Sequence, residues 1–443
     1  MNFPRYAKYK ASGVEWLGDV PEGWGVAPLK TVATHNDDTL DETTHPDTEI
    51  LYVDISGVDA LDGIKTKEPM LFSSAPSRAR RRVKHGDTIV STVRTYLRAI
   101  ARVRNPEESL IVSTGFAVIR PQAALSADYV GYVLSAGYFI EQVIARSTGV
   151  SYPAINASEL VRIPIALPPL PEQTAIAEFL DRETAKIDGL VADYRRLMEL
   201  LKEKRQAVIS HAVTKGLDPD APMKPSGIEW LGDVPEHWRT GRLGYLVDLL
   251  VDGTHFSPPN GPEGDFKYIT AKNIKEHGFD FTEITYVTAE EYSKIYPRCP
   301  VRRGDVLYIK DGATAGIAMV NPTEEQFSML SSVALIRPII TILIPEFVAY
   351  HLNAGQFKND ALNKLVGGAM TRFTVDMIKR FVFAMPPIQE QESIITFLDI
   401  QTAKFDALTT DTQQAIDLLQ ERRTALISAA VTGQIDVRQQ PRN

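Results

Sequence analysis

The sequence predicts an α+β protein in which two globular domains, related by a pseudo-two-fold axis, are joined by two long antiparallel coiled-coil helices. Three observations carry this prediction. The chain repeats itself once, short apolar runs bounded by turn residues indicate strands in both repeats, and a heptad pattern follows a double proline in both repeats.

The repeat is plainest at the start and the end of each copy. Residues 12–22 (SGVEWLGDVPE) return as residues 226–236 (SGIEWLGDVPE), 214 positions further on, and residues 168–173 (PPLPEQ) return as 386–391 (PPIQEQ), 218 positions further on. This period is too long for a solenoid. Between these matched segments the copies share only a skeleton, which indicates one fold built twice with different surface residues.

The same landmarks give the domain bounds, with Gly216 and Gly433 as helix stop signals. We expect a first globular domain over residues 1–170, a long helix over 171–216, a linker over 217–225, a second globular domain over 226–385, a second long helix over 386–433 and a C-terminal tail over 434–443.

The two long helices are predicted to share one apolar seam. Apolar and small residues recur in alternating steps of three and four after each double proline, the spacing of a coiled coil. Each helix would be roughly 66 Å long if unbroken, and Gly189 is a candidate kink in the first. The predicted interface between the helices consists of Ile187, Leu190, Tyr194, Leu197, Leu201, Val208, Phe405, Leu408, Ala415, Leu419 and Leu426.

The globular parts show short apolar runs and amphipathic segments. Strands are expected over residues 88–93, 110–119, 306–309 and 332–336, and matching helices over 129–145 and 347–365. A loop rich in Gly, Ser and Thr follows each of these helices, over 146–156 and 366–374. Such loops can present hydrogen-bond donors to a groove.

Composition sets the class of protein. With 443 residues, 44% of them hydrophobic and 23% charged, the chain is expected to be globular and multidomain. Its one cysteine, Cys299, suits a reducing cytoplasm. The first ten residues lack the apolar stretch of a signal peptide. The most apolar window, residues 333–352, is interrupted by Arg337, Pro338, Pro345 and Glu346, so no membrane span is expected.

Basic residues gather around the same Gly-Asp turn in both copies, although the net charge is −8. Charge runs are often only solvated surface, but the recurrence favours a surface that faces phosphates. In the first copy they are Arg78, Arg80, Arg81, Arg82, Lys84, Arg94, Arg98, Arg102 and Arg104; in the second they are Lys267, Lys272, Lys275, Arg298, Arg302, Arg303 and Lys310.

Catalytic motifs are missing from the sequence. The double prolines lack the Asn/Asp-Pro-Pro-Tyr/Phe pattern of amino-methyltransferases, and no Walker A loop indicates an ATP site. The eight histidines are scattered, which gives a metal cluster no support, and an acidic stretch over residues 37–42 is better explained as a solvated loop. We therefore expect a non-catalytic binding protein with no metal and no cofactor of its own.

Three repeated features carry a resemblance to a known family: two openings of the form Gly-Val/Ile-Glu-Trp-Leu-Gly-Asp-Val-Pro-Glu, two variable regions, and two Pro-Pro-x-x-Glu-Gln helices that end Ile-Ser-x-Ala-Val-Thr. With these features the chain resembles the specificity subunit of a Type I restriction-modification enzyme. The resemblance covers essentially the whole chain. It implies that the variable regions are target recognition domains, each binding one half of a bipartite double-stranded DNA sequence, and that the helices set the distance between the halves.

The resemblance also implies partners. Two modification subunits would methylate adenine N6 with S-adenosylmethionine, and two restriction subunits would translocate and cleave DNA with ATP and Mg. The candidate DNA-binding residues are Arg80, Arg81, Arg94, Arg98, Ser151 and Tyr152 in the first copy, and Lys272, Asn273, Lys310, Thr371 and Arg372 in the second.

Three other functions remain open at this point. The first is a self-contained methyltransferase-nuclease, which would need the missing catalytic motifs. The second is a purely structural coiled-coil scaffold, which would leave the basic clusters unexplained. The third is an orphan or decoy DNA-binding scaffold.

Overall fold

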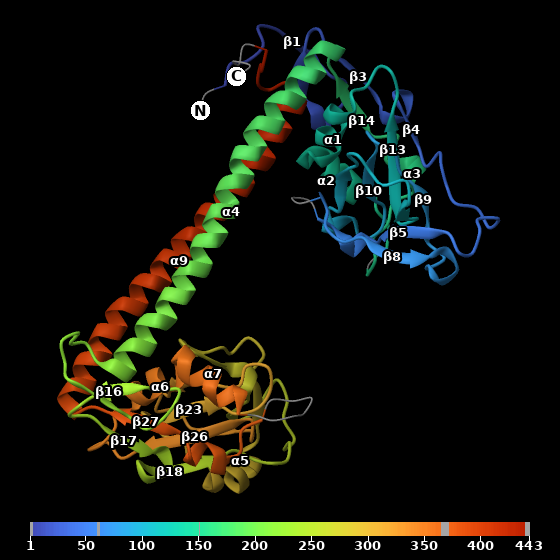
Figure 1. Cartoon of the computed structure of the whole chain (residues 1–443). Helices are drawn as coiled ribbons and strands as arrows, with labels where there is room; N and C mark the ends of the chain where they lie inside the picture. Colours follow the sequence, from blue (N-terminus) through green and yellow to red (C-terminus); the bar gives the residue numbers. More distant parts are fainter. Residues whose placement is uncertain (1–2, 60–62, 150, 365–371, 439–443) are drawn as a thin grey trace. The chain divides into compact units, whose positions relative to one another are not determined.

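The computed structural model describes residues 3–59, 63–149, 151–364 and 372–438. The chain divides into two compact units. Unit 1 comprises Met1–Tyr194 together with Gln413–Asn443, and unit 2 comprises Arg195–Thr412 (Figure 1). Each unit therefore contains one globular domain, part of the helix that follows it, and part of the other long helix.

Unit 1 is built around two four-stranded sheets. In the first the strand order is β11-β10-β13-β4, with antiparallel neighbours, and in the second it is β8-β5-β12-β9, in which β5 and β12 run parallel. Val53, Ile89, Val112 and Phe116 from these sheets lie in one buried core. The bounds are β4 (Ala33–His35), β5 (Glu49–Val53), β8 (Glu68–Leu71), β9 (Ala79–Arg82), β10 (Thr88–Ser91), β11 (Ile100–Arg102), β12 (Leu110–Ser113) and β13 (Phe116–Pro121).

Unit 2 repeats this topology. Its main sheet has the order β18-β26-β23-β24, the counterpart of β4-β13-β10-β11, and its second sheet, β22-β19-β25, again contains a parallel pair, β19 and β25. The bounds are β18 (Val247–Asp252), β19 (Phe266–Ile269), β22 (Thr285–Val287), β23 (Val306–Ile309), β24 (Ala318–Val320), β25 (Phe327–Met329) and β26 (Val333–Pro338). The fold class is α+β, as predicted.

Shorter elements complete each unit. A two-stranded ladder joins the start and the end of each globular domain: β3 (Gly25–Pro28) pairs with β14 (Pro164–Leu167), and β17 (Arg239–Arg242) pairs with β27 (Val382–Met385). The other small sheets and helices are β1 (Tyr9–Ala11) with β2 (Asp19–Pro21), β6 (Val58–Asp59) with β7 (Gly63–Ile64), β15 (Met223–Pro225) with β16 (Asp233–Pro235), β20 (Ile274–Lys275) with β21 (Gly278–Phe279), α3 (Ala157–Leu160), α5 (Ala289–Ile295) and α8 (Val375–Lys379).

Two predicted helices and one predicted strand are each broken in two. The helix expected over residues 129–145 consists of α1 (Ala127–Ser135) and α2 (Gly137–Ala145), and the one expected over 347–365 consists of α6 (Pro345–Asn353) and α7 (Gly355–Asn363). Ala136 and Ala354 separate these pairs in extended conformation. The strand expected over 110–119 is divided into β12 and β13 by the turn at Thr114 and Gly115.

The recurring Gly-Asp turn is explained by a buried ion pair. Asp87 accepts two hydrogen bonds from Arg120, at 2.8 and 2.7 Å, and a third from the backbone N–H of Lys84. Asp305 does the same with Arg337, at 2.7 and 2.7 Å, and with the N–H of Arg302. Both carboxylates are almost fully buried. A buried charge is tolerated when its lone pairs are satisfied, so this part of the repeated skeleton belongs to the interior of each domain and not to a binding surface.

The glutamine of each repeated Glu-Gln pair, at the start of each long helix, binds backbone groups of its own globular domain. The side chain of Gln173 accepts from the N–H of Ser126 at 2.8 Å and donates to the carbonyls of Ala124 and Pro168. Gln391 repeats the pattern with Ile344, Ile342 and Pro386. Because both glutamines are buried, each holds the start of a long helix against its own globular domain.

The two long helices are continuous and closely match the predicted bounds. They are α4 (Leu170–Lys215) and α9 (Ile388–Val431). In unit 1 the guanidinium of Arg423 in α9 donates to Asp188 in α4 at 2.8 Å; in unit 2 Arg205 in α4 faces Asp406 in α9 at 3.5 Å. In unit 1 Arg438 lies 3.9 Å from Glu172, and in unit 2 Gly216 lies beside Glu390. The helices therefore run antiparallel within each unit.

The buried seam differs from the predicted one at three positions. Leu190, Leu197 and Leu408 are 48%, 40% and 49% exposed, whereas Val191 and Ile416 are buried. Ile187 and Leu426 are buried, and the remaining predicted positions, Tyr194, Leu201, Val208, Phe405, Ala415 and Leu419, are partly buried. The buried stripe is thus centred one residue later at two places, at Val191 in place of Leu190 and at Ile416 in place of Ala415, a shift that periodicity alone does not reveal.

The repeated Gly-Asp-Val-Pro openings pack on helix ends. Gly433, which follows α9 at φ 74°, lies so close to Pro21 and Trp24 that an added Cβ would meet Pro21 at 2.4 Å. Gly216, which follows α4 at φ 78°, lies against Trp238 and Pro235 in the same way. Glycine is favoured at both positions by this close approach and by the left-handed backbone.

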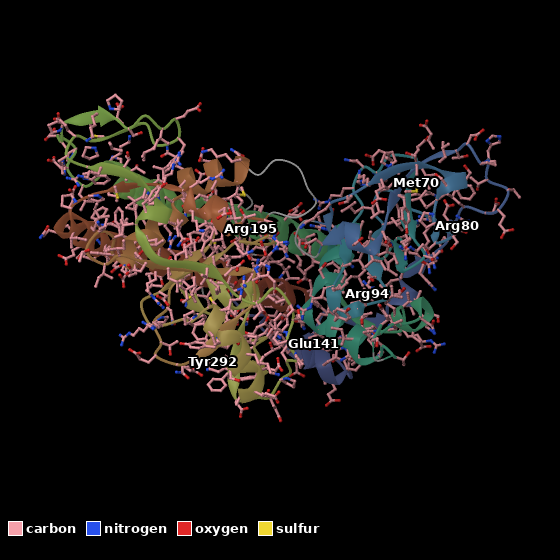
Figure 2. All side chains as sticks on the ribbon, turned by 90° about the horizontal axis from the view of Figure 1, so that it is seen from below. Met70, Arg80, Arg94, Glu141, Arg195 and Tyr292 are labelled. Atoms are coloured by element: carbon pink, nitrogen blue, oxygen red, sulfur yellow. The ribbon has the colours of Figure 1, made fainter. Side chains whose placement is uncertain are left out.

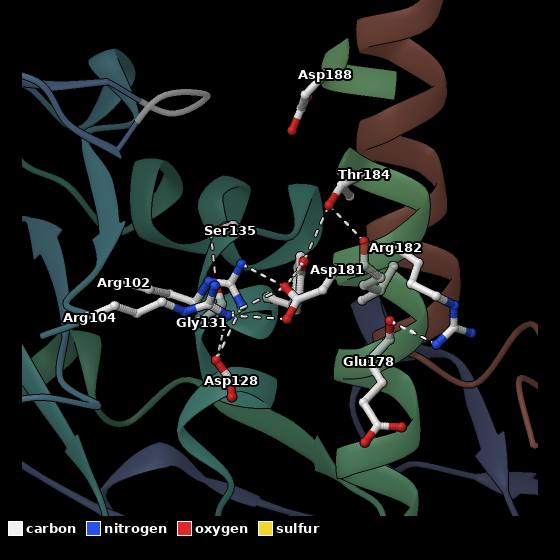
Figure 3. A network of polar contacts seen from close by, with 12 residues as sticks. Arg102, Arg104, Asp128, Gly131, Ser135, Glu178, Asp181, Arg182, Thr184 and Asp188 are labelled. Atoms are coloured by element: carbon white, nitrogen blue, oxygen red, sulfur yellow. Dashed lines mark hydrogen bonds and ion pairs between the residues drawn. The ribbon is translucent and has the colours of Figure 1, made fainter. Parts of the chain in front are cut away.

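A polar network fastens the first globular domain to α4 (Figure 3). Asp181 of the helix accepts hydrogen bonds from Tyr132 at 2.6 Å and from Arg102 at 3.0 Å, and Arg104 joins Asp181 to Asp128. In unit 2 Tyr350 donates to Asp399 at 2.6 Å, at the matching positions. The network thus belongs to the repeated domain-helix junction, with arginines added in the first copy.

One buried histidine predicts a dependence of stability on pH. His351 of α6 lies between Phe383, at a ring distance of 4.0 Å, and Phe357, and neither ring nitrogen has a hydrogen-bond partner among the described residues. Burial lowers its pKa to about 3. Because the unfolded chain binds this proton below pH about 6.5 and the folded chain does not, the free energy of unfolding of unit 2 should fall by about 1.4 kcal/mol per pH unit below that value.

Thermal unfolding between pH 7.5 and 5 measures this effect. The His351→Leu variant should lose that part of the pH dependence, whereas His211→Leu, at an exposed position of α4, should keep it. Equal pH dependence in the wild-type protein and His351→Leu would contradict the assignment.

Candidate nucleic-acid interface

Arg94 and Arg98 bracket a projecting turn in unit 1. The turn follows β10 and consists of a single 3-10 helix, Thr95–Leu97. Arg94, Tyr96, Leu97 and Arg98 are all exposed, Tyr96 by 51% and Leu97 by 49%. We refer to residues 94–98 as the arginine loop.

The Gly/Ser/Thr loop packs directly against the arginine loop. Val93 and Ala154 form an antiparallel bridge, and the hydroxyl oxygens of Thr95 and Ser147 lie 2.9 Å apart. The guanidinium of Arg94 sits over the ring of Tyr152, 4.8 Å from its centroid, a cation–π contact. Ser151 is exposed, as is Tyr152. The structure therefore brings four predicted residues of the first copy, Arg94, Arg98, Ser151 and Tyr152, onto two adjoining loops.

The backbone of the arginine loop is strained. Arg94 and Arg98 have φ values of 49° and 53°, in the left-handed region that costs an L-residue about 1–2 kcal/mol. Within the described residues, the other non-glycine residues in this region are Asn36 and Asn105, and asparagine tolerates it far better. Strain of this kind concentrates at functional sites.

Arg80 and Arg81 lie on β9 rather than on a loop. Figure 2 labels Arg80 together with Arg94 of the arginine loop; both residues belong to unit 1. The guanidinium of Arg80 covers the ring of Phe72 at 4.6 Å. Arg81 is half-buried, its Nε has no hydrogen-bond partner in the described part of the chain, and burial lowers the pKa of its guanidinium. Both arginines thus have their stems and part of their charge packed into the domain.

Sequence reasoning placed Arg78 among the basic residues of the first copy but missed its partners, Tyr52 in β5 and Asp54 directly after it. Its Nε donates to the hydroxyl of Tyr52 at 3.1 Å, and its Nη2 pairs with Asp54 at 2.7 Å. The hydrogen bond to Tyr52 and the charge of Asp54 raise the pKa of Arg78. The proximity of Arg78 to Arg80 in the sequence gave no sign of this pairing.

In unit 2 the predicted residues Lys272 and Asn273 line a groove of about 540 Å³. Lys275, Asp280 and residues 311–314 also line it. Lys272 is exposed and pairs with Glu283 at 3.0 Å. Asn273 is buried: its side chain caps the turn after Thr270 and donates to the carbonyl of Asp280. Asn273 thus holds the wall of the groove, while the lysines present charge to it.

Lys310 is buried, unlike the exposed arginines of the first copy. Its Nζ lies 3.2 Å from Asp311 and 3.5 Å from Asp252, and the side chain is 2% exposed. Arg372 forms an antiparallel bridge with Asp311 and an ion pair with it at 3.6 Å. Lys310 therefore supports the loop that carries Asp311, whereas Arg372 reaches the surface. Thr371 lies outside the described residues.

Two kinds of reactive group, metal centres and thiols, can be compared with the described part of the chain. No set of three or more metal-ligating side chains comes together there. Cys299 is buried, and burial raises the pKa of its thiol to about 12, which disfavours the reactive thiolate. No helix among the described residues is long and apolar enough to cross a membrane. Unit 1 offers basic, aromatic and polar side chains on two adjoining loops, and unit 2 offers a groove lined by lysines and polar side chains; both are suited to binding.

Comparison with known proteins agrees with this geometry. The family model described as "Type I restriction modification DNA specificity domain" matches residues 74–190 and 235–418. The chain is 20% identical over 436 residues to the Type I restriction enzyme EcoKI specificity subunit of Escherichia coli (strain K12), covering 94% of this chain and 90% of that protein. It is 21% identical over 440 residues to the StySPI specificity subunit of Salmonella potsdam, again covering 94% and 90%.

Solved structures share the fold. A chain from a structure of a type I R-M system matches with a TM-score of 0.71 at 24% identity, over 93% of this chain and 98% of that chain. The crystal structure of the HsdS subunit from Thermoanaerobacter tengcongensis matches with a TM-score of 0.52, also at 24% identity, over 94% and 98%.

Proposed function

Because the chain belongs to the family of Type I restriction modification DNA specificity domains, which it matches over both of its repeats, we propose that it binds a bipartite DNA sequence with one globular domain on each half-site. The observation that carries this proposal is the repeated topology with unlike loops. Sheet order, buried ion pairs and helix junctions agree between the copies, while the arginine loop of the first corresponds to small residues in the second.

In this function the chain supplies recognition and its partners supply chemistry. Two modification subunits would methylate adenine N6 with S-adenosylmethionine, and two restriction subunits would use ATP and Mg to translocate and cleave DNA; no cofactor is assigned to this chain. An adenine N6 inside a duplex is reached by flipping the base out of the stack, a step that belongs to the methyltransferase. Base specificity would come from side chains that reach groove edges, and orientation from phosphate contacts.

A domain exchange tests this function. Replacing residues 25–166 with the corresponding region of a relative should change one half of the methylated motif and leave the other half unchanged. The exchange begins in β3 and ends in β14, which pair with each other, so the rest of unit 1 keeps its backbone partners at the junction. Sequencing of methylated bases in cells that carry the chain and its modification subunit gives the motif.

Exchanging the second domain between β17 and β27 is the matched control, because these strands form the same junction in unit 2. It should change the other half-site. A motif that changed in both halves after either exchange would contradict the assignment of one half-site to each domain.

A further inference from the structure

Two arginines of the first copy occupy backbone positions that the second copy gives to glycine. Arg94 and Arg98, at φ 49° and 53°, correspond to Gly312 and Gly316, 218 positions further on, at φ 91° and 94°. The bridge from Val93 to Ala154 corresponds to that from Asp311 to Arg372 at the same offset, which establishes the equivalence. Since glycine adopts this backbone without strain, the fold itself has no need for arginine at either position.

The side chains of this loop are available to an external partner. Neither guanidinium forms an ion pair with a carboxylate of the described residues. Arg94 is instead stacked on the exposed ring of Tyr152, which restricts its rotamers before any ligand arrives. Tyr96 and Leu97 lie exposed between the two arginines. The loop therefore presents two guanidinium charges on either side of Tyr96 and Leu97, neither of them paired with a carboxylate of the described chain.

The second copy has a different surface at the same place. Its loop, residues 312–316, reads Gly-Ala-Thr-Ala-Gly and carries no charged side chain. The two cations beside this loop are paired with carboxylates of the domain: Lys310 with Asp311 and Asp252, and Arg372 with Asp311. The strained arginines are thus a property of the first domain alone.

We propose that Arg94 and Arg98 are the specificity-determining residues of the first domain and that they bind guanine in the groove of the first half-site. The inference rests on the proposed function. A guanidinium donates two parallel hydrogen bonds to O6 and N7 of guanine, the commonest specific contact of arginine with DNA. A phosphate contact tolerates a flexible side chain, whereas base contacts require a fixed approach. The left-handed backbone at both arginines, and the stacking of Arg94 on Tyr152, provide such an approach.

The glycine of the second copy supplies the test variants. Arg94→Gly and Arg98→Gly in the full chain, expressed with its modification subunit, should each relax at least one guanine of the first half-site. Discrimination at that base should fall by about tenfold, and the second half-site should be unchanged. The unfolding temperature should stay equal or rise, because glycine relieves the strain. Sequencing of methylated bases and thermal unfolding give the two measurements.

Arg162→Gly is the matched control, an exposed arginine of the same domain that pairs with Glu159 at 2.9 Å. It should leave the motif unchanged. An unchanged first half-site in an active Arg94→Gly, Arg98→Gly double variant overturns the inference. An equal loss of methylation at all sequences, together with a weaker salt dependence of DNA binding, overturns it too, because that result would indicate phosphate contacts. If the wild-type complex methylates no bipartite motif, it is the proposed function that fails.

Discussion

A fragment that ends at residue 224 should form a homodimer and, with the modification subunit, direct methylation to an interrupted palindrome. The fragment contains one globular domain and the whole of α4, whose apolar side has lost α9. Asp188 pairs with Arg423, and Arg205 pairs with Asp406, at positions that correspond between the copies. A second fragment can therefore offer Arg205 to Asp188, and Gly216 to Trp24, in place of the missing partners. Two identical domains in opposite orientation would bind the first half-site and its inverted repeat.

Analytical ultracentrifugation and sequencing of methylated bases test this expectation. Reversing one charge, Asp188→Arg, should weaken the dimer, because it breaks two equivalent pairs that contribute about 0.5 kcal/mol each. Adding Arg205→Asp should restore it. Tyr194 is bulky, whereas its counterpart in the second copy is the small Thr412, so Tyr194→Ala tests whether this residue hinders self-pairing of the fragment. A stable dimer that directed methylation only to non-palindromic sites would contradict the symmetric pairing of two identical fragments.

Lengthening both helices should lengthen the spacer between the half-sites. One heptad inserted after Leu197 and another after Ala415 keep the seam in phase and extend each helix by roughly 10 Å, about three base pairs of DNA. Both insertions fall inside continuous helices. The methylated motif should keep both half-sites and gain about three base pairs between them.

A heptad inserted into α4 alone is the control for this experiment. It moves Asp188 and Arg205 out of register with Arg423 and Asp406, and methylation should be lost or strongly reduced. If the doubly extended chain were active with an unchanged spacer, the helices would not set the distance between half-sites.

Much of the fold could be predicted from the sequence because duplication and periodicity are local signals. The bounds of α4 and α9 are within two residues of those expected, and β23 coincides with the predicted strand. Breaks inside helices were not predictable in the same way. Ala136 and Ala354 are good helix formers, and they are extended because α2 and α7 must turn to pack on their domains.

The candidate site was less predictable because charge in a sequence does not reveal burial. Lys310 looked equivalent to an exposed arginine, yet Asp252, 58 positions earlier in the chain, accepts its charge inside the domain. Asn273 looked like a base-contacting amide, and it caps a turn. The signal that separates Arg94 and Arg98 from other basic residues is their positive φ, which only coordinates provide.

The division of the chain into units has a consequence for its synthesis. Unit 2 is one uninterrupted stretch, Arg195–Thr412, whereas unit 1 needs Gln413–Asn443 to complete it. On the ribosome, Trp24 emerges long before Gly433, the residue against which it packs. At about 5–20 residues per second, the first domain waits on the order of 20–80 seconds for its last partner. The domain translated first is thus the last to be finished, and in that interval its uncovered surface is exposed to chaperones, to proteases and to other nascent chains.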